Sequence, residues 1–570
     1  MKTQTGAARM VEALEKAGVR CVFGLPGTQT VELFEALRQS MVRTVVATNE
    51  LSAAFMAGGW ARATGNPGVL LTIPGPGFTW ALTGLAEARL DSVPLLQITG
   101  APTRIPVNKH FRQQELDQAA IAAPVVKGVI EADSHSDPGV AVLDALKLVR
   151  SGEPGPVLLQ VLSTTLSREY TVAALQDASV TPTETATLER VCARVRSARR
   201  PMLIVGQGTI GHAGSIRALV EQMRVPLFTT PSARGVLPED HALNFGFDPF
   251  AGRIRDVNEL VESSDLVLVI GCKLAHSGTA GFQLELPANR LVHVDASAEV
   301  LGANYATSLG VVADAGDLLR ALIATAPPRS AWTDDELTTW RNRFAIRTKD
   351  AREPRITGTP GRDARGFFEA LRRALPPDAI LVLDSGTHQI LARRYYSVLA
   401  PRGLIMPTGL QSMGFAIPTA IGAKMAEPQR PVVALLGDGG FAMTALELLT
   451  AVRERVSLVV IVFVDGAFGQ IRLQQLANYG VSHGVSLESP DLSLLAESIG
   501  ARHELIGAAD AESVVRAALE RSGISILEVQ VGDTLAIRRS AAVARVREVT
   551  RRATGPRLLG LVKKLIRKMR

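Results

Sequence analysis

Short apolar runs alternate with helical patterns along most of this chain of 570 residues. In the first 165 residues the strand-like runs are apolar throughout, and the segments between them place apolar residues at helical spacing. Strands without polar alternation, separated by helices, are typical of a parallel sheet that is covered on both faces. The strands expected here are residues 43–48, 68–73, 94–99 and 156–161, and the expected helices are 49–63 and 78–90.

The same pattern restarts twice after polar interruptions. The Ser/Thr-rich stretch 171–187 is typical of a linker, and the polar segment 327–360 contains Trp332 and Trp340 as expected anchors to a neighbouring domain. We therefore expect an α/β fold with three doubly wound parallel-sheet domains. The strands expected in the second unit are 201–206, 226–230, 265–272 and 290–295, and those in the third are 379–384, 431–436, 458–464 and 524–531.

Charge changes this picture only at the C-terminus. The chain has 62 basic and 55 acidic residues, but the tail 535–570 holds 12 basic residues against one acid, Glu548. The rest is therefore mildly acidic, which gives no support to nucleic-acid binding. Apolar positions after Pro556 fall on one helical face, so we expect this basic amphipathic tail to dock on a protein surface or to lie on an anionic membrane.

Several absences favour the cytoplasm. The first residues form no signal-peptide core, and the apolar run 458–464 is far shorter than a bilayer span. The cysteines, Cys21, Cys192 and Cys272, are widely separated and form neither a CxxC motif nor a disulfide framework. We expect a cytoplasmic protein, with peripheral membrane association through the tail as an open alternative.

The strongest chemical signal lies in two glycine-rich turns of the third unit. Each turn follows an expected strand, and a helix is expected after the first, from about residue 441 to 454. Acids at the carboxyl ends of neighbouring parallel strands can converge where such sheets bind ligands, and a helix N-terminus favours a diphosphate. Two carboxylates and a backbone carbonyl could hold Mg²⁺, whereas tight turns with capping aspartates are the purely structural alternative. The turns comprise Gly437, Asp438, Gly439 and Gly440, and Asp465, Gly466, Ala467, Phe468 and Gly469.

At this spacing the two turns resemble the diphosphate motif of the thiamine-diphosphate-dependent decarboxylase and carboligase family. The resemblance implies that Asp438 and Asp465 are metal ligands through their side chains and Ala467 through its carbonyl. The other turn residues would contact the cofactor. Most members have Asn-Asn where this chain has Val464 and Asp465, a change that keeps an oxygen ligand and adds a negative charge.

The resemblance extends over roughly residues 5–533. The turn that contains Pro26 is similar to the family's opening turn, and Glu50 corresponds to the glutamate that bonds the cofactor's pyrimidine. That bond shifts the aminopyrimidine toward its imino form, which removes the thiazolium C2 proton. Taken alone, Glu50 would be a residue that complements a helix dipole. Gly75 lies in a stretch similar to a family Gly-Pro-Gly motif, in which Trp80 replaces the usual Asn.

Two further stretches of the third unit carry the resemblance. Ser385, Thr387 and His388 lie in a turn similar to the one that contacts the diphosphate in acetolactate synthases. Met413 corresponds to the bulky residue wedged between the two cofactor rings, although a lone Met is more often core filler. Gln411 stands where the family has a Gly whose carbonyl meets the pyrimidine amine, so its backbone conformation is an open question.

Two weaker signals concern the acceptor pocket and the second unit. Gln113 and Gln114 sit where carboligases place a glutamine that faces the reacting carbon, and the sequence does not choose between them. Residues 206–211 form a GxGxxG after a strand, but the next strand ends without an acid, so we interpret the glycines as turn and packing residues. Some acetolactate synthases carry FAD in this domain; we expect none here.

As a whole, the resemblance implies a pyrimidine-binding domain at 1–170, a Rossmann-like central domain at 188–326 and a diphosphate- and Mg²⁺-binding domain at 361–533. It implies a homodimer or homotetramer, with Glu50 of one subunit facing Asp438 and Asp465 of another. The expected reaction is decarboxylation of a pyruvate-like 2-oxo acid and ligation to a second carbonyl, as in acetolactate synthase. A simple decarboxylase similar to benzoylformate decarboxylase, an aldehyde lyase and a catalytically silent cofactor-binding protein are the alternatives.

Overall fold

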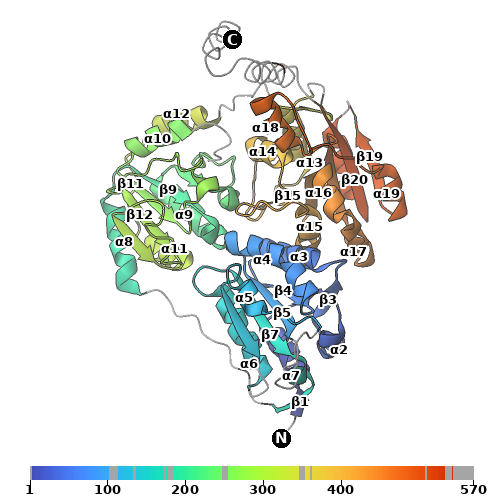
Figure 1. The fold of residues 1–570 in the computed structure, drawn as a ribbon. Helices are drawn as coiled ribbons and strands as arrows, with labels where there is room; N and C mark the ends of the chain where they lie inside the picture. Colours follow the sequence, from blue (N-terminus) through green and yellow to red (C-terminus); the bar gives the residue numbers. More distant parts are fainter. Residues whose placement is uncertain are drawn as a thin grey trace, which may run out of the picture.

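Three parallel sheets, each with its own helices, meet at a common junction in the computed structural model (Figure 1). The structure describes residues 3–101, 113–132, 136–172, 175, 184–246, 254–345, 353–359, 362–507, 510–532 and 542. The N-terminal domain presents two blue helices, α3 and α4, toward the green central domain and the orange C-terminal domain. The predicted class, α/β with three parallel-sheet units, is confirmed.

The N-terminal domain is built on a six-stranded parallel sheet of order β3-β2-β4-β5-β7-β6. Its strands are β2 (Cys21–Gly24), β3 (Arg43–Val46), β4 (Gly68–Thr72), β5 (Leu95–Ala101), β6 (Gly128–Ala132) and β7 (Pro156–Leu162). Its helices are α1 (Gly6–Lys16), α2 (Val31–Arg38), α3 (Glu50–Thr64), α4 (Pro76–Leu90), α5 (Gln118–Ala122), α6 (Pro138–Arg150) and α7 (Ser163–Ser167). Helices α1 and α6 cover one face with apolar side chains, and α3 and α4 cover the other.

The central domain has a five-stranded parallel sheet of order β10-β9-β11-β12-β13. Its strands are β9 (Pro201–Val205), β10 (Leu227–Thr229), β11 (Leu266–Ile270), β12 (Leu291–Asp295) and β13 (Leu309–Val312). Its helices are α8 (Thr185–Ser197), α9 (Ala213–Met223), α10 (Ile254–Ser263), α11 (Ala315–Ala324) and α12 (Asp334–Ala345). Trp332 belongs to this core and donates from its indole nitrogen to the Pro201 carbonyl at 2.9 Å, so the expected anchor binds to the central domain.

The C-terminal domain has a seven-stranded sheet of order β14-β20-β18-β17-β15-β16, with β19 also paired to β20. Its strands are β14 (Arg355–Ile356), β15 (Ile380–Leu383), β16 (Leu404–Ile405), β17 (Val432–Gly437), β18 (Leu458–Val464), β19 (Arg502–Ile506) and β20 (Ile524–Gly532). Its helices are α13 (Ala364–Ala374), α14 (Thr387–Tyr395), α15 (Ala416–Ala426), α16 (Asp438–Thr444), α17 (Leu448–Arg453), α18 (Gly469–Tyr479), α19 (Leu492–Ser498) and α20 (Ala511–Glu520).

Helices α3 and α15 join the N-terminal and C-terminal domains into one continuous apolar core. Their close contact requires glycine, because a Cβ at Gly59 would lie 2.1 Å from the Thr419 carbonyl oxygen. One at Gly422 would lie 2.0 Å from that of Met56. The contact places the start of α3, at Glu50, beside the C-terminal domain.

The structure differs from the sequence expectation at several elements. The helix expected at 441–454 is wrong in its start and continuity: α16 begins at Asp438, and a 3₁₀ turn at Ala445–Glu447 separates it from α17. The expected list lacked β2, β6, β13, β16 and β19, which are short or carry charged residues. Two antiparallel additions were also missed: β14 pairs with β20, and β1 (Thr3–Thr5) pairs with β8 (Glu169–Thr171).

Other expectations concern features outside the sheets. No helix among the described residues is long and apolar enough to cross a membrane. All three cysteines are buried and free, as their spacing indicated. The basic tail 535–570 falls almost wholly outside the described residues, and so does His110, which flanks the two candidate glutamines.

Candidate active site

Asp438 is the first residue of α16 and is 5% exposed. Its Oδ1 accepts a hydrogen bond from the Gly439 amide at 2.9 Å, and its Oδ2 accepts from the Gly466 amide and the Ser489 hydroxyl, both at 2.8 Å. The bond to Gly466 joins the two glycine-rich turns at the carboxyl ends of β17 and β18. The predicted convergence of the two turns is therefore present.

Asp465 lies in the second turn, directly after β18. Its Oδ1 accepts from the Ala467 amide at 3.2 Å, and its Oδ2 lies 3.6 Å from the guanidinium of Arg472 on α18. A Cβ at Gly469 would lie 2.2 Å from Asp465 Oδ2, so only glycine lets the carboxylate pack against the start of α18. The negative charge that distinguishes this chain from the Asn-Asn pattern thus has a positive neighbour.

The donor set of these turns fits a hard cation such as Mg²⁺. Oxygen ligands from carboxylates and carbonyls are what Mg²⁺ prefers, and it usually completes its shell with phosphate and water. Asp438, Asp465 and the Ala467 carbonyl could supply three such oxygens. In the described part of the chain, no group of three or more His, Cys, Asp or Glu side chains gathers as a metal site. A cation here would therefore depend on the carbonyl and on ligand oxygens.

The turn after β15 places a second helix N-terminus at the same sheet edge. Asp384 is fully buried and accepts from the amides of Ser385, at 2.8 Å, and Ala416, at 3.1 Å. Burial raises the pKa of Asp384 to about 7, against the lowering effect of these amide donors. The carboxyl therefore ties the start of α15 to this turn.

His388 is buried rather than solvated and sits in the first turn of α14. Its Nε2 bonds to the Asp384 carbonyl oxygen at 2.9 Å, an arrangement that assigns the ring proton to Nε2. Burial lowers the pKa of His388 to about 4, so the ring is neutral at physiological pH. The ring packs against Gly386 and Gly437, which leaves it as a wall of the site.

Thr387 supplies the observation that best fits a diphosphate. It is the first residue of α14, and its buried Oγ1 has no hydrogen-bond partner among the described residues. Buried hydroxyls without partners are rare, so this atom is suited to a ligand oxygen. The N-termini of α14 and α16 both open at the carboxyl edge of the sheet, and both favour negative charge.

The glycines of the first turn have partly structural roles. A Cβ at Gly439 would lie 3.0 Å from the Phe468 ring, and one at Gly440 would lie 3.1 Å from the Asp384 carboxyl. These positions therefore need glycine for packing within the chain. Only Gly437 has ordinary spacing, with His388 Nδ1 3.5 Å from an added Cβ.

The loop that carries Gln411 and Met413 runs beside this turn. Gln411 has φ of 62°, the left-handed conformation that glycine adopts most easily, which settles the question left open by the sequence. Its side-chain amide donates to the Pro407 carbonyl at 2.8 Å, and its Oε1 accepts from the Ser385 hydroxyl at 3.4 Å. The backbone geometry expected of a Gly is thus kept, and Met413 is half-buried two residues later.

The N-terminal domain holds a second group of candidate residues. Glu50 is 8% exposed at the start of α3, and a Cβ at Gly77 would lie 2.7 Å from its Oε1, so its carboxylate packs against the first turn of α4. Gly75 precedes α4 with φ of 68°, and an added Cβ there would lie 3.0 Å from Gln114 Cβ. Gln114 therefore lies beside Gly75, whereas Pro26 is exposed.

The structure distinguishes the two glutamines that the sequence could not. Gln114 has φ of 60° and accepts a hydrogen bond from Gln29 Nε2 at 2.7 Å. Gln113 is exposed. Gln114 is therefore the better candidate for a residue that faces the reacting carbon.

Sequence reasoning missed several residues that shape these groups. Ser489 reaches Asp438 from 51 positions away, and no local pattern marks it. Glu447, buried after α16, accepts from the amide of Thr48 at 3.1 Å, from its hydroxyl, and from the Thr450 hydroxyl at 2.6 Å. It thereby ties the turn that precedes Glu50 to the C-terminal domain.

The GxGxxG stretch of the central domain lines a separate cleft at the junction. The cleft has a volume of about 490 Å³ and lies at the carboxyl ends of β9, β11 and β12. The stretch forms a 3₁₀ turn, Gln207–His212, and Gln207 donates to the Asp91 carbonyl at 2.6 Å. Lys273 and Glu153 form an ion pair at 2.6 Å in the same cleft. The absence of FAD stays a prediction.

Comparison with known proteins agrees with this geometry. Residues 4–121, 188–322 and 384–529 match the N-terminal TPP binding domain, the central domain and the C-terminal TPP binding domain of thiamine pyrophosphate (thiamine diphosphate) enzymes. The probable 2-ketoarginine decarboxylase of Pseudomonas aeruginosa is 32% identical over 538 residues, which cover 93% of this chain and 94% of that protein.

Two acetolactate synthases are similar over almost the same length. The isozyme 1 large subunit of Escherichia coli is 29% identical over 541 residues, covering 93% of this chain and 94% of that protein. The probable large subunit of Methanocaldococcus jannaschii is 29% identical over 523 residues, covering 88% and 87%. With three matched domains around two convergent turns, the chain belongs to the thiamine pyrophosphate enzyme family.

Proposed function

We propose that this thiamine-diphosphate-dependent enzyme uses Mg²⁺, decarboxylates a pyruvate-like 2-oxo acid and ligates the remaining fragment to a second carbonyl, in the manner of an acetolactate synthase. The observation that carries the proposal is the joined pair of turns, with Asp438 bonded to Gly466 and the unpartnered Thr387 hydroxyl at the same sheet edge. Both features suit a metal-bound diphosphate.

Each group of residues has a role that follows from its place. When bound, the cofactor supplies a carbon nucleophile and an electron sink for decarboxylation. Asp438, Asp465 and the Ala467 carbonyl would hold Mg²⁺, and the N-termini of α14 and α16 would favour the diphosphate charge. Glu50 would hold and exchange a proton through its carboxylate at the pyrimidine ring. Gln114 would orient the acceptor carbonyl.

Single-turnover release of CO₂ from pyruvate, with thiamine diphosphate and Mg²⁺, tests this proposal. We expect Glu50→Ala to slow release by at least about 100-fold, the usual scale of acid–base catalysis. Glu35→Ala is the matched control, because Glu35 lies on the exposed face of α2 and pairs only with its helix neighbours. Acetolactate in the products would support ligation, and acetaldehyde alone would support a simple decarboxylase. Unchanged release by Glu50→Ala would contradict the role of Glu50.

A simple decarboxylase is the second candidate, and one relative favours it. That protein is named a probable 2-ketoarginine decarboxylase and aligns over 93% of this chain. The same assay with 2-ketoarginine in place of pyruvate compares the two substrates directly. Faster release from 2-ketoarginine, with an aldehyde as sole product, would move the assignment to decarboxylase.

We also propose a homo-oligomer, supported by an apolar stripe along α16 and α17. Met443, Leu446, Leu449 and Val452 follow one another at three-residue spacing and are 43% to 61% exposed. Contiguous apolar patches of this kind mark interfaces. Because α16 begins at Asp438, a second copy seated here would lie next to the proposed metal site, where it could bring its own Glu50.

Sedimentation of a charged variant tests this interface. Leu446→Glu should dissociate the oligomer and reduce turnover, since a charge would be buried in the contact. Leu494→Glu is the matched control, because Leu494 is 64% exposed on a different helix, α19, and is not part of the stripe. If both variants sediment as dimers, as the wild type does, the stripe is not the interface.

A further inference from the structure

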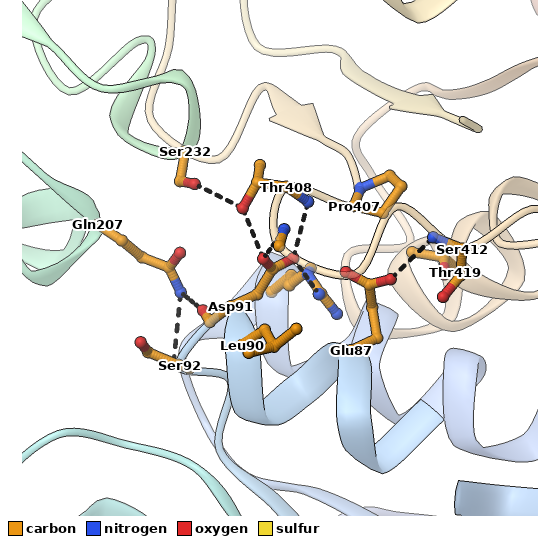
Figure 2. Close-up of polar contacts among 12 residues, drawn as sticks. Glu87, Leu90, Asp91, Ser92, Gln207, Ser232, Pro407, Thr408, Ser412 and Thr419 are labelled. Atoms are coloured by element: carbon orange, nitrogen blue, oxygen red, sulfur yellow. Dashed lines mark hydrogen bonds and ion pairs between the residues drawn. The ribbon is translucent and has the colours of Figure 1, made fainter. Parts of the chain in front are cut away.

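Glu87 is a buried carboxyl that the proposed reaction does not use. It lies on α4 and is fully buried at the junction of the N-terminal and C-terminal domains (Figure 2). Its Oε2 accepts a hydrogen bond from the Ser412 amide at 3.1 Å. Its buried Oε1 has no partner among the described residues. A buried carboxylate oxygen without a partner is unusual in a protein interior and calls for a physical reason.

The partner of Glu87 is the loop that carries Met413. Asp91, the residue that caps the C-terminal end of α4, holds the other end of this loop. It accepts from the Thr408 amide at 3.2 Å, the Thr408 hydroxyl at 2.5 Å and the Gly409 amide at 2.9 Å (Figure 2). Arg62 also pairs with Asp91 at 2.9 Å. One carboxyl on α4 and one at its C-terminal cap therefore hydrogen-bond to the loop at two points.

The carboxylates of Asp91 and Glu87 differ in how many hydrogen-bond partners they have. Asp91 has donors from two residues and a guanidinium beside it, whereas the hydrogen-bonding partner described for Glu87 is Ser412. Between them the loop passes through Gln411 in the left-handed conformation, which costs free energy for a residue with a side chain. On the Met413 side, Asp384 holds the backbone from residue 414 onward, and the Glu87–Ser412 bond holds the residue directly before Met413.

We propose that Glu87 is a positioning residue: through its bond with the Ser412 amide it sets the conformation of loop 410–413, and its protonation state makes that control dependent on pH. The significance of Met413 rests on the proposed function, but the contact itself does not. Glu87 touches no proposed cofactor ligand and acts only through the loop.

The surroundings of Glu87 set the direction of the pH effect. Burial raises the pKa of Glu87 to about 7, and the charge of Asp91 at the C-terminal end of α4 acts in the same direction. Arg62 on α3 and hydrogen bonding from Ser412 oppose this rise. An acid whose pKa rises on folding binds more protons when folded, so stability falls as pH rises from the unfolded pKa through about 7. The neutral Glu87 carboxyl therefore favours the conformation in which loop 410–413 covers it. The charged carboxylate favours a conformation in which water reaches Glu87.

Hydrogen exchange of the full-length chain without cofactor is the direct test. We expect the protection of the Ser412 amide, relative to its intrinsic exchange rate, to fall by roughly tenfold between about pH 6 and pH 8.5 in the wild type. Glu87→Gln keeps an oxygen acceptor and is always neutral, so its protection should not change with pH. Glu87→Ala should lose protection at every pH.

A matched variant separates positioning from general stability. Gln97 is also fully buried in the N-terminal domain and bonds to Thr72, away from the loop. Gln97→Ala should lower the unfolding midpoint and leave Ser412 protection unchanged. A wild-type pH dependence that persists in Glu87→Gln, or full protection in Glu87→Ala, would overturn the proposal.

A second readout uses the cofactor. Loop 410–413 contacts thiamine diphosphate under the proposed function. The dissociation constant of thiamine diphosphate, measured by fluorescence quenching with Mg²⁺, should then rise with pH in the wild type and should not change with pH in Glu87→Gln. Failure of all proteins to bind thiamine diphosphate would contradict the proposed function alone, because the exchange result on the cofactor-free protein would still decide the role of Glu87.

Discussion

The two halves of the candidate site are built in different ways. In the C-terminal half, carboxylates and backbone amides from the ends of neighbouring strands bond to one another, as Asp438 does with Gly439 and Gly466. In the N-terminal half, Glu50 begins a helix and Gln114 lies in a turn, and both depend on more distant contacts. Glu447 holds the turn before Glu50 from another domain, and Gln114 accepts a hydrogen bond from Gln29. The C-terminal half of the candidate site is therefore held within one sheet, whereas the N-terminal half is held partly by another domain.

Among these variants, removing Asp438 should have the largest effect on stability and on cofactor binding. Asp438→Ala leaves two amides and the Ser489 hydroxyl without their acceptor, a destabilisation of about 3–5 kcal/mol. It should also abolish the thermal stabilisation that thiamine diphosphate with Mg²⁺ gives. Asp438→Asn, which keeps an acceptor oxygen, should lose the cofactor shift at a smaller cost in stability. A cofactor shift that persists in Asp438→Ala would contradict the metal assignment.

Removing Glu447 should be the next largest change, and it tests the dependence of the N-terminal half. Glu447→Ala removes the acceptor of the buried Thr450 hydroxyl and that of the part-buried Thr48 amide and hydroxyl, at about 2–3 kcal/mol by denaturant unfolding. Glu454→Ala is the control at the same domain contact, because its partner Arg43 is half exposed and such pairs contribute at most about 1 kcal/mol. Equal losses in the two variants would mean that Glu447 has no special role.

The pair Asp465 and Arg472 offers a smaller and sharper test. Both side chains are partly buried and lie 3.6 Å apart, so a double-mutant cycle of Asp465→Asn and Arg472→Gln should give a coupling of about 1 kcal/mol or less. Added Mg²⁺ should reduce the coupling if the cation competes for Asp465. A coupling that is unchanged by Mg²⁺ would place the cation elsewhere.

The smallest expected effects on stability concern the two glutamines. Gln114→Ala loses one hydrogen bond, about 0.5–1 kcal/mol, and should lower the yield of ligated product relative to aldehyde. Gln113→Ala should leave both unchanged, since Gln113 is exposed. The two variants form a natural pair, and a product change in Gln113→Ala alone would reverse the assignment.

The sequence could predict the elements that burial dictates. Strand 458–464 was expected within the bounds that β18 has, because a run of seven apolar residues is buried along its whole length. The nearness of Asp438 and Asp465 followed from parallel strands that end at one edge. Strand β19 was missed because its sequence, RHELI, carries charges and is half exposed, and β14 because two residues form no pattern.

The finer geometry depended on contacts that no local pattern records. Ser489 and Glu447 reach their partners across 51 and 399 positions of sequence. The choice between Gln113 and Gln114 rests on the exposure of Gln113 and on the hydrogen bond and positive φ of Gln114. Gln411 adopts the left-handed conformation at a position where the family pattern has glycine. These long-range hydrogen bonds and backbone conformations arise only in the folded chain, so no local sequence pattern predicts them.

The edges of the sheets have a consequence for behaviour at high concentration. The C-terminal sheet ends in strands of two residues, β14 and β16, and its other outer strand, β19, places Arg502 and Glu504 along its edge. Short or charged edge strands offer little template for pairing with another chain. The C-terminal sheet is therefore protected against edge-to-edge aggregation with another copy of the chain.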